Sequence, residues 1–222
     1  MANPALLFCS MVMSDAEEPY NPLDLRRLGE GIARALLARP VSPLPPAKRF
    51  FGSGIYAIYY TGDFSPYEPI AERNRDDRFK MPIYVGKGIP EGRRTGGSGF
   101  GPTLGPDLFR RLGQHARTIT AAERNLKLND FFCRYLVVAP VWIPLGEELL
   151  IRGFSPLWNT VVSGFGNNDP GSRRYTQQRS LWDVLHPGRP WAAKCAPNPR
   201  TPGEIVDSVR DALTQLDYQT RS

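Results

Sequence analysis

Residues 53–60 read Ser-Gly-Ile-Tyr-Ala-Ile-Tyr-Tyr, and residues 81–87 read Met-Pro-Ile-Tyr-Val-Gly-Lys. β-Branched and aromatic residues dominate both runs, and glycine or proline borders them, so both are predicted to be strands. Each run has a glycine near a tyrosine, and a residue without a side chain lets another backbone or a phosphate approach closely. Residues 131–138 form a third predicted strand, which ends before Pro140.

Helices and connectors are predicted around these strands. Asn21-Pro22 has the form of a helix N-cap followed by proline, and apolar residues then recur at helical spacing until Pro40. A proline-rich connector, 41–47, leads into the first strand. Residues 107–116 and 145–152 are predicted helices, and Thr201 and Glu204 have the spacing of a capping box for a last helix. We expect an α/β (α+β) domain with a small, largely antiparallel three-stranded sheet flanked by helices.

The composition is that of a globular protein with an anionic partner. The chain has 222 residues, of which 41% are hydrophobic and 23% charged, as in an ordinary folded domain. A net charge of +6 favours nucleic acid as the partner. Three scattered cysteines and two histidines indicate neither a disulfide framework nor a zinc site, and they fit a reducing cytoplasm. No apolar run is long enough to span a bilayer.

Polar residues that can act on a phosphate follow the strands in a distinctive order. Arg111 and His115 are four residues apart, which places them on one face of a helix. A glutamate on the next helix precedes Phe154-Ser-Pro-Leu-Trp-Asn159. The complete order is Tyr56, Tyr84, Arg111, His115, a glutamate and Asn159.

This order, with the triplets Gly54-Ile55-Tyr56 and Tyr84-Val85-Gly86, resembles the GIY-YIG nucleases, in which isoleucine usually stands where this chain has Val85. It is most similar to their type II restriction endonucleases, and the resemblance covers roughly residues 53–160. It implies a cytoplasmic bacterial enzyme that cuts double-stranded DNA at a short, GC-rich palindrome such as CCGCGG, with Mg²⁺ or Mn²⁺ and beside a cognate DNA methyltransferase. A repair or homing nuclease and a non-catalytic DNA-binding protein are the alternatives.

The resemblance also implies roles for single residues. Glu147 would be the Mg²⁺ ligand, because it lies twelve residues before Asn159, and Glu148 is its rival. Arg111 would clamp the scissile phosphate with its rigid guanidinium, and the adjacent Arg110 is its rival. One carboxylate suffices for Mg²⁺, which fills its other positions with water and phosphate oxygens.

Four further residues complete the implied catalytic set. Tyr56 would be the general base, and cations such as Arg111 and Lys87 would lower the pKa of its phenol. Tyr84 would hydrogen-bond phosphate or water, and His115 would titrate near neutrality and relay a proton. Asn159 would position the loop or helix of the glutamate rather than react.

The rest of the chain would supply DNA contacts and a dimer interface. We divide it into a loose N-terminus (1–20), a helix and connector (21–52), the nuclease core (53–160) with an inserted loop (61–80), and a C-terminal extension (161–222). A homodimer, formed on its own or only on DNA, would match the two-fold symmetry of a palindrome. The expected DNA-binding residues are Lys87, Arg73, Arg75, Arg78, Arg93, Arg94, Arg173 and Arg174.

Overall fold

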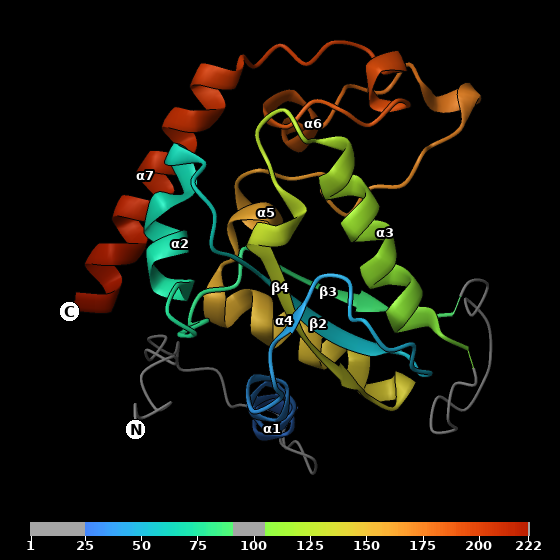
Figure 1. The fold of residues 1–222 in the computed structure, drawn as a ribbon, viewed down its shortest axis with the longest axis vertical. Helices are drawn as coiled ribbons and strands as arrows, with labels where there is room; N and C mark the ends of the chain where they lie inside the picture. The colour runs from blue at the N-terminus through green and yellow to red at the C-terminus, as the bar shows by residue number, and fades with distance from the viewer. Residues whose placement is uncertain (1–24, 91–104, 222) are drawn as a thin grey trace, which may run out of the picture.

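A four-stranded antiparallel sheet forms the centre of the computed structural model, which describes residues 25–90 and 105–221 (Figure 1). Its strands lie in the order β1-β4-β2-β3. The register pairs Tyr56 with Gly86 on one side and with Tyr135 on the other. β2 lies between two partners, and all of its residues are buried, as expected of a continuous apolar run. The strands are Ser42–Pro43 (β1), Gly54–Tyr60 (β2), Tyr84–Gly88 (β3) and Phe131–Val137 (β4).

Helices cover both faces of this sheet. The α-helices are Leu25–Leu37 (α1), Glu68–Asn74 (α2), Asp107–Ala121 (α3), Ile143–Phe154 (α4), Leu157–Thr160 (α5), Leu181–Leu185 (α6) and Pro202–Arg221 (α7). Short 3₁₀ helices lie at Ser65–Tyr67 (η2), Leu128–Asp130 (η3), Pro140–Trp142 (η4), Ser172–Arg174 (η5) and Ala192–Lys194 (η6). Among the described residues, no helix is long and apolar enough to cross a membrane.

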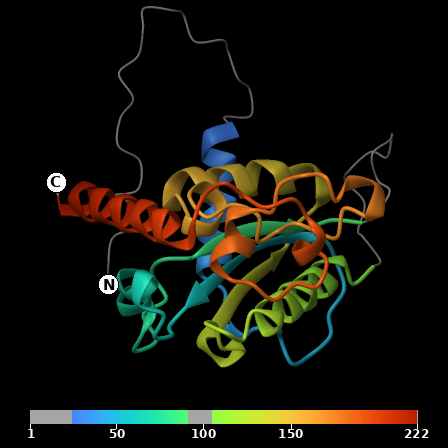
Figure 2. The ribbon, with the colours of Figure 1, turned by 90° about the horizontal axis from the view of Figure 1, so that it is seen from above.

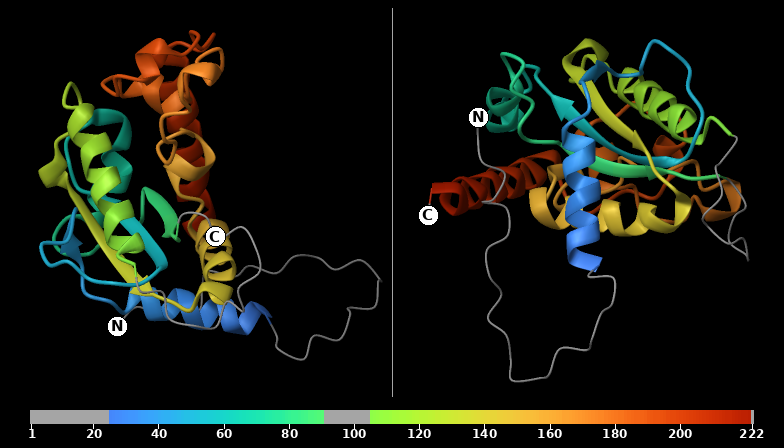
Figure 3. Two further views of the ribbon diagram at one scale, coloured as in Figure 1. Left: turned by 90° about the vertical axis from the view of Figure 1, so that its right-hand side faces the viewer. Right: turned by 90° about the horizontal axis from the view of Figure 1, so that it is seen from below.

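The alternating side chains of β2 supply two hydrophobic cores, one on each face. Ile55, Ala57 and Tyr59 pack against α1 and α4, and Figure 3 shows α1 lying across the sheet beside α4. Tyr56 and Ile58 face the larger core, which includes residues of α3, α5, α6 and α7. α7 runs beside α2 (Figure 2). The larger core therefore joins the central strands to the C-terminal part of the chain.

The segment 61–80 is folded, whereas the sequence led us to expect a long loop. It contains η2 and α2, and Tyr67, Ile70 and Asn74 are buried. The side-chain nitrogen of Asn74 donates to the backbone carbonyls of Tyr60 and Met81, and its side-chain oxygen accepts from the backbone amide of Met81. Buried residues at spacings of three and four form one face of this segment. The many charged residues between them hid that pattern.

One other expectation about the fold needs correction, and a second is confirmed. The sheet has four strands rather than three, because Ser42–Pro43 in the expected connector pairs with β4. Proline is compatible with that place, since an edge strand leaves its missing donor on the solvent side. The capping box of α7 is confirmed: the Thr201 amide donates to the Glu204 carboxylate, and the Glu204 amide donates to the Thr201 hydroxyl.

Candidate active site

An open pocket of about 310 Å³ lies between β2, β3, α3 and α4. It brings together residues that lie far apart in the sequence and that carry the chemistry expected of the site. His115 lies behind the pocket, in contact with Tyr56. The lining residues are Tyr56, Tyr84, Lys87, Gly88, Ile89, Asp107, Arg110, Arg111, Gln114, Glu147 and Asn168.

The two glycines of the strand triplets make room for this site. A Cβ atom on Gly86 would lie 2.5 Å from the hydroxyl oxygen of Tyr56, its partner across the strands. A Cβ atom on Gly54 would lie 2.0 Å from the carbonyl oxygen of Leu136. Any larger residue at either position would force a shift, because real Cβ atoms do not approach that closely. Gly86 therefore leaves room for the Tyr56 side chain, and Gly54 lets β2 lie close to the backbone of β4.

Tyr56 and His115 form a buried pair at the floor of the pocket. The Tyr56 hydroxyl lies 2.5 Å from His115 Nε2, and both residues are at most 1% exposed. Burial, then Arg111 and Arg189, holds the pKa of His115 well below its usual range. Burial and the neighbouring Tyr84 raise the pKa of Tyr56 well above 10, although Arg111 opposes them.

Both pKa shifts run against the expectations from sequence. His115 does not titrate near neutrality, since burial disfavours its charged form and lowers its pKa. The pKa of Tyr56 is raised, because desolvation outweighs the attraction of Arg111. Tyr56 and His115 are therefore both neutral at physiological pH, and Tyr56 is not a phenolate in the resting site. The pKa of Tyr84 is raised for the same first reason, its burial.

Arg111 is held in the pocket by its neighbours. Its Nη2 donates to the carbonyl of Gly166 at 2.6 Å, and its Nη1 donates to the side-chain oxygens of Gln114 and Asn168, each at 3.1 Å. Arg110 also lines the pocket, but its side chain is 47% exposed and lies 3.7 Å from Asp107. The geometry favours Arg111 as the phosphate clamp.

Glu147 extends from α4 into the pocket, and its side chain is only 18% exposed. Its Oε2 lies 2.7 Å from Nζ of Lys87, a residue of β3. Glu148 turns away and pairs with Arg152 one helical turn later, where both side chains are mostly exposed. The arrangement favours Glu147 over Glu148 as a metal ligand.

Comparison with known proteins gives the family of this chain. The family model of the Eco29kI GIY-YIG domain matches residues 48–213, which is well over half of the chain. The chain belongs to the Eco29kI GIY-YIG domain family. No curated protein matches it. As a GIY-YIG domain it is a nuclease, and the match continues past residue 160, where the motifs end.

One carboxylate of the GIY-YIG pocket, that of Glu147, has the chemistry that a divalent metal ion would need. Within residues 25–90 and 105–221, no group of three or more histidine, cysteine, aspartate or glutamate residues could hold a metal. Two carboxylates line the pocket: Glu147 is paired with Lys87, whereas Asp107 accepts from the Ser53 hydroxyl and lies beside Arg110. Mg²⁺ is commonly bound through one or two carboxylates, waters and substrate phosphates, so Glu147 matches that use.

Asn159 supports the pocket of this GIY-YIG domain from behind. Its side-chain oxygen accepts from the Val85 amide at 2.8 Å, and its side-chain nitrogen donates to the Val85 carbonyl at 2.9 Å. Both bonds fix the backbone of Val85, which lies in β3 between the pocket residues Tyr84 and Lys87. Asn159 does not line the pocket, so it positions the strand of the site rather than the glutamate helix.

The expected DNA-binding residues are scattered over the domain. Lys87 lies in the pocket. Arg73, Arg75 and Arg78 belong to the segment 61–80, which follows β2, and none of them lines the pocket. Arg75 is already bound to Glu68 and to two carbonyls. The structure does not bring these three arginines to the pocket.

Four of the expected DNA-binding residues remain: Arg173, Arg174, Arg93 and Arg94. Arg173 and Arg174 are exposed on η5, five and six residues after Asn168 of the pocket wall. Arg93 and Arg94 lie outside the described residues. The buried cysteines Cys133 and Cys195 are free thiols.

Sequence reasoning missed the loop 164–168, which forms one wall of the nuclease pocket. The Gly166 carbonyl and the Asn168 side chain bind Arg111. The Phe165 ring stacks on His115, with centroids 4.5 Å apart and planes 19° apart. Its glycines and asparagines marked it only as a loop. The pair Asn167-Asn168 after Gly166 was the feature of the sequence that could have indicated polar groups facing the pocket.

Proposed function

We propose that this GIY-YIG nuclease is a type II restriction endonuclease, which hydrolyses both strands of DNA at a short palindrome with Mg²⁺. One observation carries the proposal: a single pocket is lined by Tyr56, by the held guanidinium of Arg111 and by the carboxylate of Glu147, and His115 contacts Tyr56 from behind it. Phosphodiester hydrolysis needs a base for water, a clamp for the phosphate and stabilisation of the leaving oxygen. The Tyr56–His115 pair can supply the base, Arg111 can clamp the phosphate, and Glu147 can hold a metal ion that stabilises the leaving oxygen.

The Tyr56–His115 pair supplies the base as a proton relay. The hydroxyl of Tyr56 takes the proton of the attacking water while it gives its own proton to Nε2 of His115. Nε2 of the neutral imidazole lies within hydrogen-bond distance of the Tyr56 hydroxyl and accepts that proton as the water is deprotonated. A buried phenol with a raised pKa could not act alone, since its anion is disfavoured. The short contact between the two residues supports this coupling.

Charge on the phosphate is balanced by Arg111, Lys87 and a metal ion at Glu147. Arg111 presents a planar fork that suits phosphate oxygens. A bound Mg²⁺ would stabilise negative charge on the phosphate and on the leaving oxygen. Lys87 keeps a second positive charge next to Glu147. These cations favour the transition state, where charge on the phosphoryl group is redistributed.

Double-strand cleavage by a one-carboxylate site is most simply made by two copies of the chain. One pocket acts on one strand, so a homodimer with a two-fold axis matches the symmetry of a palindrome. The charge of +6 on each chain opposes association at low salt, and DNA relieves that repulsion. Sedimentation on a short palindromic duplex should give two chains per duplex. A single chain that makes double-strand breaks without a nicked intermediate would overturn the dimer.

The biological setting follows from the same proposal. An endonuclease with a short recognition site would also cut the DNA of its own cell, so a cognate DNA methyltransferase must protect those sites in the cytoplasm. The exposed arginines on η5 suit the acceptor edges of guanine. A GC-rich palindrome such as CCGCGG is the substrate we propose.

Incubation with supercoiled plasmid tests the proposed function. With Mg²⁺ or Mn²⁺ the protein should convert plasmid to linear DNA and discrete fragments, and EDTA should stop it. Binding to DNA without any cleavage in either metal would make the protein a non-catalytic DNA-binding protein. A smear of fragments without discrete bands would remove the sequence specificity but leave the nuclease.

A further inference from the structure

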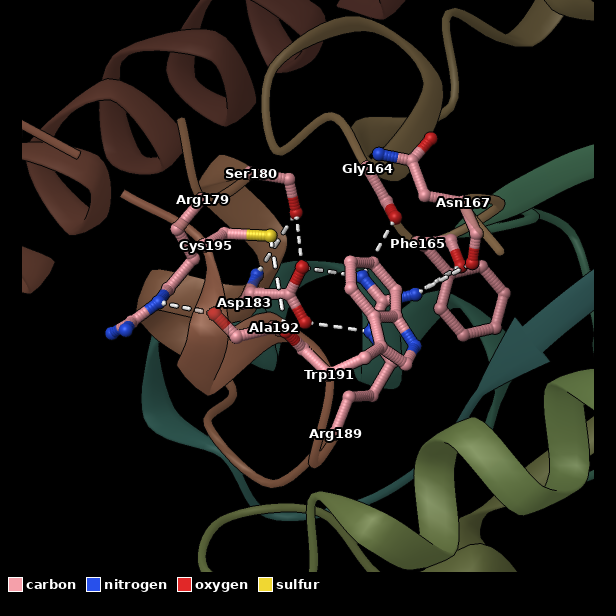
Figure 4. Close-up of polar contacts among 10 residues, drawn as sticks. All are labelled: Gly164, Phe165, Asn167, Arg179, Ser180, Asp183, Arg189, Trp191, Ala192 and Cys195. Carbon is pink, nitrogen blue, oxygen red and sulfur yellow. Dashed lines mark hydrogen bonds and ion pairs between the residues drawn. The ribbon is translucent and has the colours of Figure 1, made fainter. Parts of the chain in front are cut away.

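Arg189 is buried against the loop 164–168, where it binds three backbone carbonyls (Figure 4). Its side chain is 4% exposed and that of its partner Asp183 is 1% exposed. The guanidinium lies over the ring of Trp182 at 4.9 Å and over that of Trp191 at 4.5 Å. Such a residue is out of reach of DNA, so its charge does not serve as a phosphate contact.

All five N–H groups of the Arg189 guanidinium have partners. Nε and Nη2 donate to the two carboxylate oxygens of Asp183, each at 2.6 Å. The other donors go to the carbonyls of Gly164 at 2.9 Å, Phe165 at 3.2 Å and Asn167 at 2.9 Å. Arginine carries five donors in a rigid fork, and here three backbone carbonyls of one short loop take three of them. Arg189 therefore fixes the backbone path of that loop.

The opposite side of the same loop holds the pocket residues. Between the carbonyls bound by Arg189, the Gly166 carbonyl accepts from Arg111, and the next side chain, Asn168, also accepts from Arg111. Phe165 stacks its ring on His115. Residues of this loop that bind Arg189 through their carbonyls therefore alternate with, or are the same as, residues that contact Arg111 or His115. A shift of any carbonyl bound by Arg189 would move one of those contacts.

We propose that Arg189, oriented by Asp183, is a positioning residue of this nuclease, which acts through the loop 164–168 to hold Arg111 and the His115 ring in place for cleavage. The inference rests on the proposed function. Arg189 touches neither substrate nor reacting atoms. Its removal should slow the chemical step and leave DNA affinity nearly unchanged, since the basic residues exposed to DNA remain.

The test uses the full chain with Arg189→Lys, which keeps the charge but has only three donors on one nitrogen and cannot span Asp183 and three carbonyls. The single-turnover cleavage rate is measured with enzyme in excess over a duplex that the wild-type protein cuts. The Kd for that duplex is measured with Ca²⁺ in place of Mg²⁺. We expect a rate about 100-fold lower, the loss typical of a misplaced catalytic group, and an unchanged Kd.

Arg179→Lys is the matched control. Arg179 also donates to backbone carbonyls, those of Ala192 and Ala193, in the same part of the fold (Figure 4). It does not bind the loop 164–168, so this variant should cut at nearly the wild-type rate. If Arg189→Lys fails to fold, Asp183→Asn replaces it, because the asparagine loses the charge that orients the guanidinium but keeps an acceptor.

The outcomes separate this inference from the proposed function. A wild-type protein that does not cut DNA would refute the proposed function, and the inference would fall with it. A cutting wild type with an Arg189→Lys variant of equal rate would refute the inference alone. An equal loss of affinity and rate would refute it as well, since a positioning residue for Arg111 and His115 must act on the rate.

Discussion

Replacing Tyr56 with phenylalanine distinguishes a catalytic tyrosine from a core tyrosine, because the change deletes one buried hydroxyl. The hydroxyl lies 2.5 Å from His115 Nε2, and the Tyr56 side chain is 0% exposed. Leaving a buried partner without its hydrogen bond costs about 1–3 kcal/mol. A domain of this size is stable by about 5–15 kcal/mol, so Tyr56→Phe should remain folded.

The loss of activity should be far larger than the loss of stability suggests. Without the hydroxyl, the water has no group through which its proton can reach His115. General acid–base catalysis contributes about 10²–10⁴-fold to a rate, and we expect the cleavage rate of Tyr56→Phe to fall by about that factor. The rate is measured as a single turnover on plasmid DNA, and stability is measured by urea unfolding of the same preparation.

Tyr60→Phe is the matched control for that experiment. Tyr60 lies on the same strand and in the same core, is 1% exposed, and its hydroxyl accepts from the Phe64 amide at 2.8 Å. It should lose a similar amount of stability and keep the wild-type cleavage rate. If Tyr56→Phe cuts DNA as fast as Tyr60→Phe, Tyr56 is only a core side chain and the proton relay is wrong.

The other predictions concern the metal, the phosphate clamp and pH. Glu147→Gln should reduce cleavage to background and leave DNA affinity nearly intact, whereas Glu148→Gln should cut normally; the reverse result in a plasmid assay would exchange their roles. Arg111→Ala should slow cleavage and lower the slope of log affinity against log salt by about one, and an unchanged slope in binding titrations would exclude a phosphate contact. His115 and His186 are neutral in the folded state, with burial lowering the pKa of His186 to about 3, and each becomes charged below about pH 6.5 when unfolded. Each histidine should therefore remove about 1.4 kcal/mol of stability per pH unit as the pH falls below 6.5. The stability of His186→Gln, measured by urea unfolding, should depend less steeply on pH; an unchanged dependence would mean that His186 is charged in the folded protein.

The centre of the fold could be predicted from sequence because it depends on short-range patterns. β2 and β3 are apolar runs bordered by glycine and proline, and α3 carries Arg111 and His115 on adjacent turns. Both strands and that helix form as expected. The four residues Tyr56, Tyr84, Arg111 and Glu147 meet in one pocket, which the order of the motifs predicted.

The support of the site could not be predicted, because it depends on contacts between distant segments. Arg189 lies in a proline-rich stretch that reads as a linker, and its role depends on carbonyls more than twenty residues away. The pKa shifts of Tyr56 and His115 are set by burial, and sequence showed only their charged neighbours. The apolar face of α2 was hidden because charged residues occupy most positions between its buried ones.

Sequencing the ends of DNA cut by the wild-type protein tests the central claim most directly. One pocket that hydrolyses phosphodiesters at a palindrome predicts that the ends produced with Mg²⁺ map to one short symmetric sequence. The same digest with Glu147→Gln should yield no such ends. Ends scattered over unrelated sequences, or the same ends produced by Glu147→Gln, would contradict the account.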